Sequence, residues 1–555
     1  MAEKIFIGVA WPYANGSLHT GQIVGAYLPA DIFARYHRAA GNRVLMVSGS
    51  DQHGTPITVR AEEEGRTPQE VVAQFHAEFM ETWERLGISW DLYTTTGTEN
   101  HAHTTHDIFL RLLEKGDIYK DIMKLPYCIV EERFLLDRYV EGTCPNCGNE
   151  GARGDQCDNC GNVLDPSDLI DPRCKFDGSR PEVRDSEHFF LRLNAYNDRL
   201  KEWLSRDKEH WRRNVLNFSL GVLKGGLRDR AITRDLEWGV SIPVPGYEKK
   251  RIYVWFENVI GYLSAAKEWA QRSGDPEAWR EFWQDPACKS YYFIGKDNIW
   301  FHTLSWPAQL MGYGELNLPY DVPANQYLMV RGSKASTSRN LAIWLPDYLS
   351  RYDPDPLRYY LSANMPETAD TDFTWADFVR RNNDELLAAW GNLANRVLTF
   401  AHRHFGAAVP QPDDLTADDT ALLAQVEAAL NECGDSIAHS RFRVGIETAM
   451  AAARAANRYL EEQAPWRLID EDRDRCATVI YSAIAAINGL KVAFSPYLPF
   501  TSQRLHGYLG YEGPLEATGW QFLPPQPGQP LAKPDPLYRK LDPSIAEEEE
   551  ARLGR

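Results

Sequence analysis

The chain has 555 residues, of which 43% are hydrophobic and 25% are charged. This is the composition of a folded protein, and no stretch reaches the ~18 uninterrupted apolar residues of a membrane span, so disordered and membrane classes are excluded. The 60 basic and 78 acidic side chains give a net charge of −18, so any contact with nucleic acid must come from local basic patches. With no secretory signal in view, we expect a cytoplasmic protein of several domains.

The chain opens with an apolar run at 5–10, a glycine-containing turn, a helical pattern to about Arg38 and a second apolar run at 44–47. This βαβ pattern predicts an α/β fold with a Rossmann-type parallel sheet. Strand-like runs at 251–256 and 290–294, with a helical pattern between them, suggest that the sheet continues there. We therefore expect a sheet that is split by a long insertion.

The turn at 12–22 lies between the first strand and the first helix, where a ligand at the carboxyl edge of the sheet would meet it. We expect the helix start to offer unpaired N–H groups and a positive dipole to phosphates, with Gly21 allowing a nucleotide close to the backbone. His19 and Gln22, three residues apart, would share one helix face. The alternative is a plain turn that His19 caps.

Five of the nine cysteines fall between Cys144 and Cys174. Cys144, Cys147, Cys157 and Cys160 form two x2-spaced knuckles, which suit tetrahedral coordination of one structural Zn²⁺. Unligated or disulfide-bonded cysteines are the alternative, which a reducing compartment disfavours.

A glycine- and serine-rich loop at 331–340 carries cations at both ends. It could be an exposed linker, but such loops also bring ammonium and guanidinium groups onto pyrophosphate. From about residue 386 amphipathic helical patterns dominate, at 385–402, 416–432, 437–463 and 474–493, and predict a helical bundle. Beyond residue 522 the chain is proline-rich and ends in an acidic run at 547–550.

The two loops resemble the signature motifs of class I aminoacyl-tRNA synthetases, His-x-Gly-His and Lys-Met-Ser-Lys-Ser. The segments 10–16, 49–54, 253–256 and 293–297 are similar to the methionine-specific branch of that class. The resemblance covers residues 5 to about 545. Gln22 stands in place of the second histidine and Thr337 in place of the second lysine, and we expect Arg339 to supply the missing cation.

The resemblance implies an ATP-dependent enzyme that activates L-methionine as methionyl-adenylate and transfers it to the 3′-terminal ribose of initiator and elongator tRNA. Mg²⁺ would enter with ATP. The residues implied in catalysis are His19, Gln22, Lys334 and Arg339. The residues implied in ATP binding are Gly21, Asp297, Lys334 and Thr337.

A methionine thioether is best held by aromatic walls, which Tyr13, Trp255 and Tyr262 could provide, while Asp51 would pair with the α-amino group. Ordinary core packing is the alternative for these aromatic side chains. By resemblance the pocket consists of Ala10, Trp11, Tyr13, Asp51, Trp255, Tyr262 and His302, with the Tyr262 hydroxyl directed to sulfur. Glu257 and Asn258 replace an aspartate and a small residue of many relatives.

Two further sites are implied. In the bundle, Asn392, Arg396, Pro465 and Trp466 resemble the anticodon reader of the family, although a buried tryptophan among polar residues is the alternative. In the insertion, Cys128, Glu131, Cys174 and Asp177 repeat the x2 spacing of a second knuckle found in some relatives. Two thiolates with two carboxylates are an unusual structural zinc site, so a metal-free remnant is preferred.

These patterns divide the chain into six regions: the first half of the catalytic domain (1–115), a connective insertion with the zinc knuckle (116–235), the second half of the catalytic domain (236–325), a stem-contact region with the Lys334 loop (326–385), a helical anticodon-binding domain (386–530) and a tail (531–555). The expected partners are ATP, L-methionine and tRNA, with no membrane, and the expected state is a monomer. Two alternatives stay open: a related ligase that loads a small-molecule acceptor, and a catalytically weak tRNA-binding paralogue.

Overall fold

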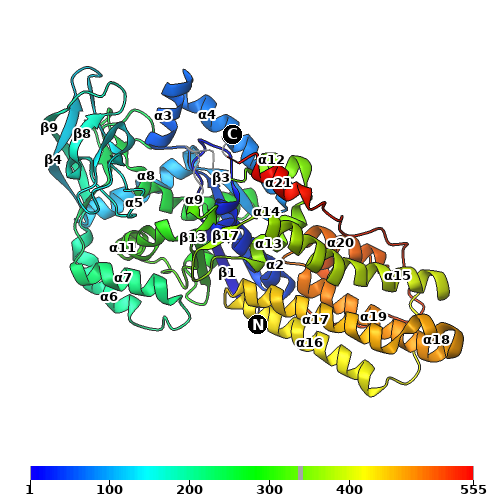
Figure 1. The fold of residues 1–555 in the computed structure, drawn as a ribbon. Coiled ribbons are helices and arrows are strands. Elements are labelled where there is room, and N and C mark those ends of the chain that lie inside the picture. The colour runs from blue at the N-terminus through cyan, green and yellow to red at the C-terminus, as the bar shows by residue number, and fades with distance from the viewer. Residues whose placement is uncertain (1, 335–341, 554–555) are drawn as a thin grey trace.

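The structure is a computed structural model, which describes residues 2–334 and 342–553. A parallel sheet lies at the centre, with a β-rich insertion on one side of it and a helical bundle on the other (Figure 1). The chain thus has the parallel sheet, the insertion and the helical bundle that the sequence predicts.

The central sheet has five parallel strands in the order β14-β13-β1-β2-β3. Their bounds are β1 Lys4–Val9, β2 Arg43–Ser50, β3 Leu92–Thr95, β13 Lys289–Gly295 and β14 Ala324–Asn325. Five of the six residues of β1 are buried, because helices cover both faces of a parallel sheet. The predicted fold class is confirmed, and the two halves of the sheet are separated in sequence by the insertion.

The predicted strand at 251–256 is wrong beyond its first two residues. Strand β12 covers only Arg251–Ile252 and pairs with β11, Thr233–Arg234, outside the central sheet. The chain then turns into a short helix, α8, Val254–Glu257, whose Val254, Phe256 and Glu257 are buried. A short apolar run fits a buried strand and a buried helix equally well, so periodicity could not separate them.

The insertion is more regular than its glycine and proline content suggests. A four-stranded sheet, β10-β9-β4-β5, is built on the long antiparallel pair β4, Ile118–Cys128, and β9, Glu182–Leu191, with β5, Arg133–Phe134, and β10, Arg230–Ala231, at its edges. A three-stranded sheet, β7-β6-β8, carries the cysteines and is centred on β6, Val140–Thr143, with β7, Ala152–Arg153, and β8, Ile170–Cys174, on either side. Both sheets are antiparallel, so the insertion is a separate structural unit on the catalytic domain.

The bundle consists of long helices, as predicted. Its main members are α15 Asn392–His404, α16 Ala417–Ala438, α17 Phe442–Gln463, α18 Pro465–Glu471, α19 Arg473–Phe494 and α20 Pro499–Tyr508. The sequence put the start of the third helix too early, because Ser440, in the left-handed region at φ 54°, separates α16 from α17. Among the described residues one helix, α19, is apolar and long enough to cross a membrane, but 94% of its apolar window is buried inside the protein.

A buried ion pair joins the catalytic domain to the bundle. Arg358 of α13, Pro354–Ala363, pairs at 2.6 Å with Asp31 of α2, Leu28–Ala39, and both side chains are fully buried. Arg358 also donates to the Pro496 and Tyr497 carbonyls at the end of the bundle. The positive charges of Arg35 and Arg358 outweigh the effect of burial and lower the pKa of Asp31 to about 2.

The C-terminal segment folds back onto the region around the Lys334 loop. Helix α21, Ser544–Glu550, packs against α14, Trp375–Arg381. Glu550 pairs at 3.0 Å with Arg331, three residues before Lys334, and Glu549 pairs with Arg351. The acidic run at the end of the sequence is therefore part of the folded structure.

Candidate functional site

A cavity of about 290 Å³ opens at the carboxyl ends of β1 and β13. This is the edge where open parallel sheets bind their ligands. Eight predicted site residues line it: Ala10, Trp11, Tyr13, His19, Gly21, Gln22, Trp255 and Asp297. Tyr27, Asn298, Gln326 and Tyr327 also line it and were missed; only Asn298, which follows Asp297 directly, had a signal in the sequence.

His19 caps the helix that starts at Thr20. Its Nδ1 accepts a hydrogen bond from the Gly21 N–H at 3.2 Å, and Gln22 Oε1 accepts one from the His19 N–H at 3.0 Å. The Thr20 N–H donates to the Ile343 carbonyl at 3.0 Å, and the Gln22 N–H donates to the His19 carbonyl at 3.0 Å. The prediction that this helix start offers unpaired N–H groups is therefore wrong.

The capping contacts fix which atoms the two signature side chains present. With Nδ1 as an acceptor, neutral His19 carries its proton on Nε2, which is a hydrogen-bond donor. Gln22 directs Oε1 at the His19 N–H, so its amide Nε2 points elsewhere. This Nε2 group donates no hydrogen bond to any residue in 2–334 or 342–553. Both residues can thus donate to an anionic ligand.

The second signature segment lies beside the first. Strand β16, Ser333–Lys334, pairs with β15, Leu328–Val330, and the chain just after the loop returns so that the Leu345 N–H donates to the Leu18 carbonyl at 2.8 Å. The rings of Trp344 and His19 meet at 5.8 Å. Thr337, Arg339 and the side chain of Lys334 lie outside the described residues.

Asp297 lines the same cavity and lies two residues after the end of β13. Its carboxylate accepts a hydrogen bond from the Tyr327 hydroxyl, and Lys296 lies 3.7 Å from the centre of the Tyr327 ring. Lys296 in turn pairs with Asp370 at 2.7 Å. An acidic group held in this way at the strand end suits the ribose hydroxyls of a nucleotide.

Tyr13 and Trp255 form an aromatic corner of the cavity. Their rings meet edge to face at 6.1 Å, and Trp255 stacks on Phe301 at 4.2 Å. Tyr13 and Trp255 are only half-buried, so they present ring surface to the cavity. This arrangement fits an apolar, flexible side chain such as a thioether.

Trp11 fills the space behind this corner. A Cβ at Gly49 would lie 2.1 Å from its ring, and a Cβ at Gly261 would lie 2.8 Å from it, so both positions require glycine. The ring of Trp11 also meets that of Tyr262 at 6.4 Å. The two glycines are thus part of the site. Gly49 opens the segment 49–54 that resembles the family, whereas nothing in the sequence pattern singles out Gly261.

Tyr262 and His302 lie deeper, almost fully buried, and do not line the cavity. His302 Nδ1 donates to the Asn298 carbonyl at 2.9 Å, so Nε2 accepts from the Tyr262 hydroxyl at 2.7 Å. Burial keeps His302 neutral by lowering its pKa to about 4. The Tyr262 hydroxyl hydrogen is therefore used within the protein, and in this arrangement Tyr262 presents only an oxygen to a ligand.

Asp51 is 1% exposed, and its backbone forms a parallel β-bridge with the backbone of Tyr13. Its carboxylate accepts hydrogen bonds from Asn258 Nδ2 at 2.6 Å and from the His53 N–H at 3.0 Å. Burial, and then the negative charge of Glu257, raise the pKa of Asp51 well above its ordinary value. A cationic ligand group would stabilise its ionised form.

Glu257 does not line the cavity. It is fully buried between His53 Nδ1, at 2.8 Å, and His101 Nε2, and His101 Nδ1 in turn meets Ser264 Oγ at 3.0 Å. The two imidazoles outweigh the effect of burial and lower the pKa of Glu257 to about 2. This cluster braces the segment that carries Asn258 and Trp255.

The four predicted zinc ligands converge. The Cys144 and Cys160 sulfurs lie 3.9 Å apart, the Cys147 and Cys157 sulfurs lie 3.6 Å apart, and all four lie within 4.8 Å of one another. Tetrahedral Zn–S bonds of about 2.3 Å separate sulfurs by about 3.8 Å. A hydrogen bond from Asn159 is the main cause that lowers the pKa of Cys147 to about 6. The cluster is compatible with a zinc site, and the disulfide alternative is wrong because all four thiols are free.

The second candidate cluster is incomplete. Cys128, Cys174 and Asp177 bring their ligand atoms within 4.8 Å of one another. The Glu131 carboxylate pairs instead with Arg133 at 3.1 Å. Asp177 is exposed, so the three remaining groups form only an open, partial site.

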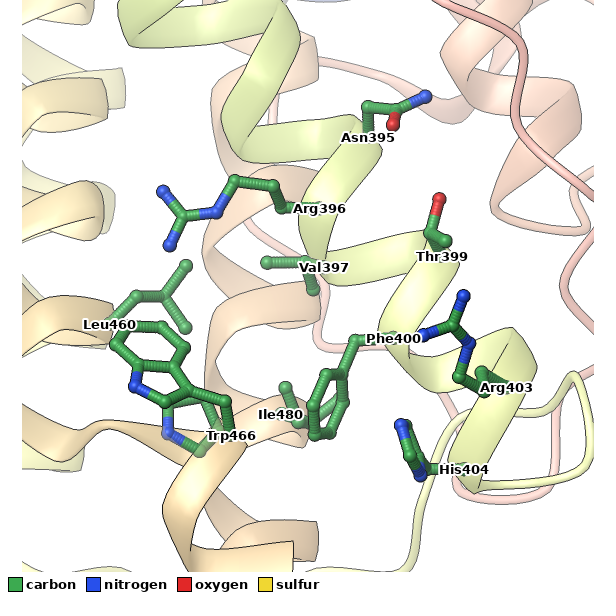
Figure 2. Close-up of a pocket in the computed structure, with 11 residues that line it drawn as sticks. Asn395, Arg396, Val397, Thr399, Phe400, Arg403, His404, Leu460, Trp466 and Ile480 are labelled. Carbon is green, nitrogen blue, oxygen red and sulfur yellow. The ribbon is translucent and has the colours of Figure 1, made fainter.

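In the bundle a pocket of about 270 Å³ lies between α15, α18 and neighbouring helices (Figure 2). Arg396, Pro465 and Trp466 line it, whereas Asn392 does not, and Asn395 lines it instead. The Arg396 guanidinium lies 5.6 Å from the centre of the Trp466 ring, which is 45% exposed. The alternative of a buried tryptophan is wrong, and the pocket offers an aromatic face and a cation to a single-stranded base.

Comparisons with known proteins agree with this architecture. Residues 5–398 match a family model described as class I tRNA synthetases (M), and residues 409–554 match one described as the anticodon binding domain of methionyl tRNA ligase. A methionyl-tRNA synthetase of Mycobacterium tuberculosis, solved with methionyl-adenylate, has the same fold, with a TM-score of 0.80 at 24% identity over 97% of this chain and 99% of that one. The split parallel sheet, the cysteine-bearing insertion and the helical bundle are thus those of a class I tRNA synthetase.

Comparison with full-length relatives identifies the family within this class. A methionine–tRNA ligase of Dehalococcoides mccartyi is 58% identical over 554 residues, which cover 100% of both chains. One of Thermomicrobium roseum is 53% identical over 580 aligned positions, which cover 100% of this chain and 99% of the relative. The chain belongs to the methionine–tRNA ligase family, and the family resemblance seen in the sequence is confirmed.

Proposed function

We propose that the chain activates L-methionine with ATP and transfers it to the 3′-terminal ribose of initiator and elongator tRNA for methionine. The observation that carries this proposal is the shared cavity of about 290 Å³, which is lined by residues predicted for both substrates. An adenylate requires such an arrangement, because the amino-acid carboxylate and the α-phosphate of ATP must meet. Full-length similarity to methionine–tRNA ligases supports the same function.

In the first step a methionine carboxylate oxygen attacks the α-phosphorus of ATP, forming methionyl-adenylate and releasing pyrophosphate. A carboxylate is a nucleophile at neutral pH, so alignment and charge stabilisation are the tasks of the protein. The His19 Nε2–H and the Gln22 amide supply hydrogen bonds to phosphate oxygens, and Lys334 and Arg339 remain sequence-based candidates for the cations. In the second step a ribose hydroxyl of tRNA attacks the methionyl carbonyl carbon and AMP leaves.

The substrate amino acid is held at two ends. Asp51 pairs with the α-ammonium, and Tyr13 and Trp255 enclose the side chain, with Trp11, Tyr262 and His302 closing the far side. Ala10 lies beside them at the end of β1, and Gly21 and Asp297 contact the nucleotide, with Thr337 as a further candidate. Ala10, Trp11, Tyr13, Gly21, Trp255 and Asp297 line the cavity, which supports their roles. Asp51, Tyr262 and His302 are buried outside its lining, so their roles rest on the family resemblance.

The metal roles follow from the donor sets. Cys144, Cys147, Cys157 and Cys160 would hold one Zn²⁺, and because four protein ligands leave no open position, the zinc is structural. Mg²⁺ bound through the ATP phosphates would add positive charge where pyrophosphate leaves. We further propose a cytoplasmic monomer.

The test is amino-acid-dependent exchange of pyrophosphate into ATP, followed by charging of methionine tRNA. We expect exchange with L-methionine and little exchange with leucine, which has a similar size but lacks the thioether. Charging without a tRNA requirement, in which the label appears on a small acceptor, would favour the related ligase. Absence of exchange with methionine would refute the proposal.

A further inference from the structure

Asp297, which lines the catalytic cavity, is preceded in the chain by a lysine that pairs with a different carboxylate. The Nζ of Lys296 lies 2.7 Å from Asp370 Oδ1. Within 2–334 and 342–553, Asp370 is the one acidic partner of Lys296. A lysine ammonium is a point charge on a flexible stem, so it pairs with the anion that is offered to it. Asp370 therefore decides where this positive charge lies.

Asp370 is held in a fixed place beside the cavity wall. The segment before it is tied to that wall, because the Gln326 N–H donates to the Pro366 carbonyl at 2.7 Å. The residue after it is tied there too, since the Thr371 N–H donates to the Tyr327 carbonyl at 3.0 Å. Gln326 and Tyr327 both line the cavity. With backbone hydrogen bonds on both sides of it, the Asp370 carboxylate is a fixed anchor.

Tyr327 connects the two carboxylates. Asp370 Oδ1 accepts the Tyr327 N–H at 2.8 Å, in addition to Lys296 Nζ. At the other end of the same residue, the Tyr327 hydroxyl donates to the Asp297 carboxylate. The Lys296 ammonium lies 3.7 Å from the centre of the ring between them. Burial and the negative charge of Asp297 raise the pKa of Tyr327, so its hydroxyl stays protonated and remains a donor.

The Lys296–Asp370 pair adds little to the stability of the fold, because both side chains are partly exposed. Its position matters more for the charge of the site. If Lys296 paired with Asp297 instead, its ammonium would weaken the hydrogen bonds that this carboxylate accepts from a ligand. The pair with Asp370 keeps the ammonium at the backbone end of Tyr327, away from the hydroxyl end that Asp297 binds.

We propose that Asp370 is a positioning residue for ATP, which holds Lys296 away from Asp297 and so reserves the Asp297 carboxylate for the ribose hydroxyls of the nucleotide. This role rests on the proposed function, since it takes the nucleotide to be ATP and its ribose to meet Asp297. Asp370 itself does not line the cavity, so it acts through Lys296 and Tyr327 and not by touching the substrate.

The first test compares ATP with 2′-deoxy-ATP and 3′-deoxy-ATP in pyrophosphate exchange by Asp370→Asn. The new asparagine oxygen can still accept the Tyr327 N–H, so the substitution removes the charge alone. The released Lys296 ammonium should then pair with Asp297. We expect kcat/KM for ATP to fall by about 10-fold, the lower end of the range for a hydrogen bond to a charged group. The analogue that lacks the bound hydroxyl should lose much less, so the preference for ATP over it should shrink.

Asp285→Asn is the matched control. Asp285 also binds a lysine, Lys4 Nζ, at 2.7 Å and accepts the Ala287 N–H at 2.9 Å. Its side chain is 31% exposed, against 42% for Asp370. Lys4 begins β1, whereas the cavity opens at the opposite end of that strand. We expect Asp285→Asn to keep the full preference for ATP, and both variants to keep the thermal stability of the unaltered protein.

The second test removes the ammonium itself. Methionine at position 296 keeps an unbranched side chain over the Tyr327 ring but carries no charge. If Asp370→Asn acts by releasing Lys296, the double variant of Lys296→Met with Asp370→Asn should regain most of the preference for ATP that Asp370→Asn lost. A double variant with a preference as low as that of Asp370→Asn would refute the role of the ammonium.

The variant Asp297→Asn separates the positioning role from the function on which it rests. We expect it to abolish the preference for the ribose hydroxyl. If it does so while Asp370→Asn keeps the preference, or loses the same factor with ATP and with both analogues, the positioning role is refuted and the ribose contact stands. If Asp297→Asn keeps the preference, the ribose contact fails and the role of Asp370 fails with it. Absence of methionine-dependent exchange in the unaltered protein would refute the proposed function as well.

Discussion

Asp51→Asn isolates the charge that the site offers to the substrate ammonium. Aspartate and asparagine side chains have nearly the same shape. The two groups that donate to the Asp51 carboxylate, the His53 N–H and Asn258 Nδ2, are both neutral. The asparagine oxygen can still accept from His53, and the Asn258 amide can rotate to accept from the new NH₂ group, so the local fold should persist. At 1% exposure water cannot replace the lost charge. Removing one member of a buried charge pair costs about 2–5 kcal/mol, which corresponds to about 30- to 5,000-fold in kcat/KM for methionine.

The assay is pyrophosphate exchange at varied methionine and at varied ATP. We expect Asp51→Asn to raise the KM for methionine and to leave the KM for ATP nearly unchanged. Asn258→Ala is the matched control, because it removes one neutral hydrogen bond and keeps the charge, for a loss of about 5-fold. A methionine KM within threefold of the unaltered protein would refute the assignment of Asp51.

The same variant has a pH signature. Burial raises the pKa of Asp51, and the substrate ammonium favours its ionised form, so kcat/KM for methionine should fall as the pH falls through the free-state pKa. Asp51→Asn cannot ionise and should lose this acid limb. If kcat/KM of Asp51→Asn still fell in the same way at low pH, that fall would be due to the ionisation of another group.

Three other predictions concern the frame around the site. Asp31→Asn leaves Arg358 buried without its partner and should lower the free energy of unfolding by about 3–5 kcal/mol, measured by denaturant titration. The pKa of Asp31 is lowered to about 2, so the stabilisation by Asp31 is full above about pH 4 and is lost as the pH falls towards 2. The difference in stability between Asp31→Asn and the unaltered protein should therefore narrow at low pH. Purified protein should contain about one zinc, and Cys147→Ser should lose it and impair charging more than exchange; a zinc-free protein with full charging would contradict this. Glu550→Gln weakens the contact with Arg331 beside the signature loop and should lower the exchange rate severalfold at unchanged thermal stability, and equal exchange rates would show that the contact does not affect the loop.

Most of the fold could be predicted because its signals are periodic and long. Strand β1, the helices of the bundle and the cysteine knuckles each repeat a pattern over several residues, and tertiary packing merely confirms it. The failure at 251–256 has the opposite cause. Five of the six residues at 251–256 are apolar or aromatic, so the run carries no period, and the helix that buries Val254 and Phe256 is decided by tertiary packing.

The sequence predicts those cavity residues that belong to continuous motifs, but it does not predict those that only the folding of distant segments brings together. His19, Gln22 and Trp255 follow from motifs. His19 itself pairs with the Gly21 and Gln22 N–H groups, but the partner of the Thr20 N–H is the Ile343 carbonyl, which only the return of the chain brings there. Gly49 and Gly261 belong to the site only because the Trp11 ring lies against both. Asn395 was missed in favour of Asn392 because a helix face depends on which side its neighbours cover, and the sequence of one helix cannot show this.

The position of α21 has a practical consequence for anyone who handles this protein. The two ends of the chain lie on different sides of the molecule, and the C-terminal end lies beside the segment that enters the signature loop (Figure 1). A purification tag or fluorescent fusion at the C-terminal end would follow α21, whose Glu550 pairs with Arg331, three residues before Lys334, so a bulky tag there would hinder turnover without disturbing folding. An N-terminal attachment precedes β1, and the cavity opens at the opposite, carboxyl end of that strand, so rates measured with the two designs should not be assumed to be equivalent.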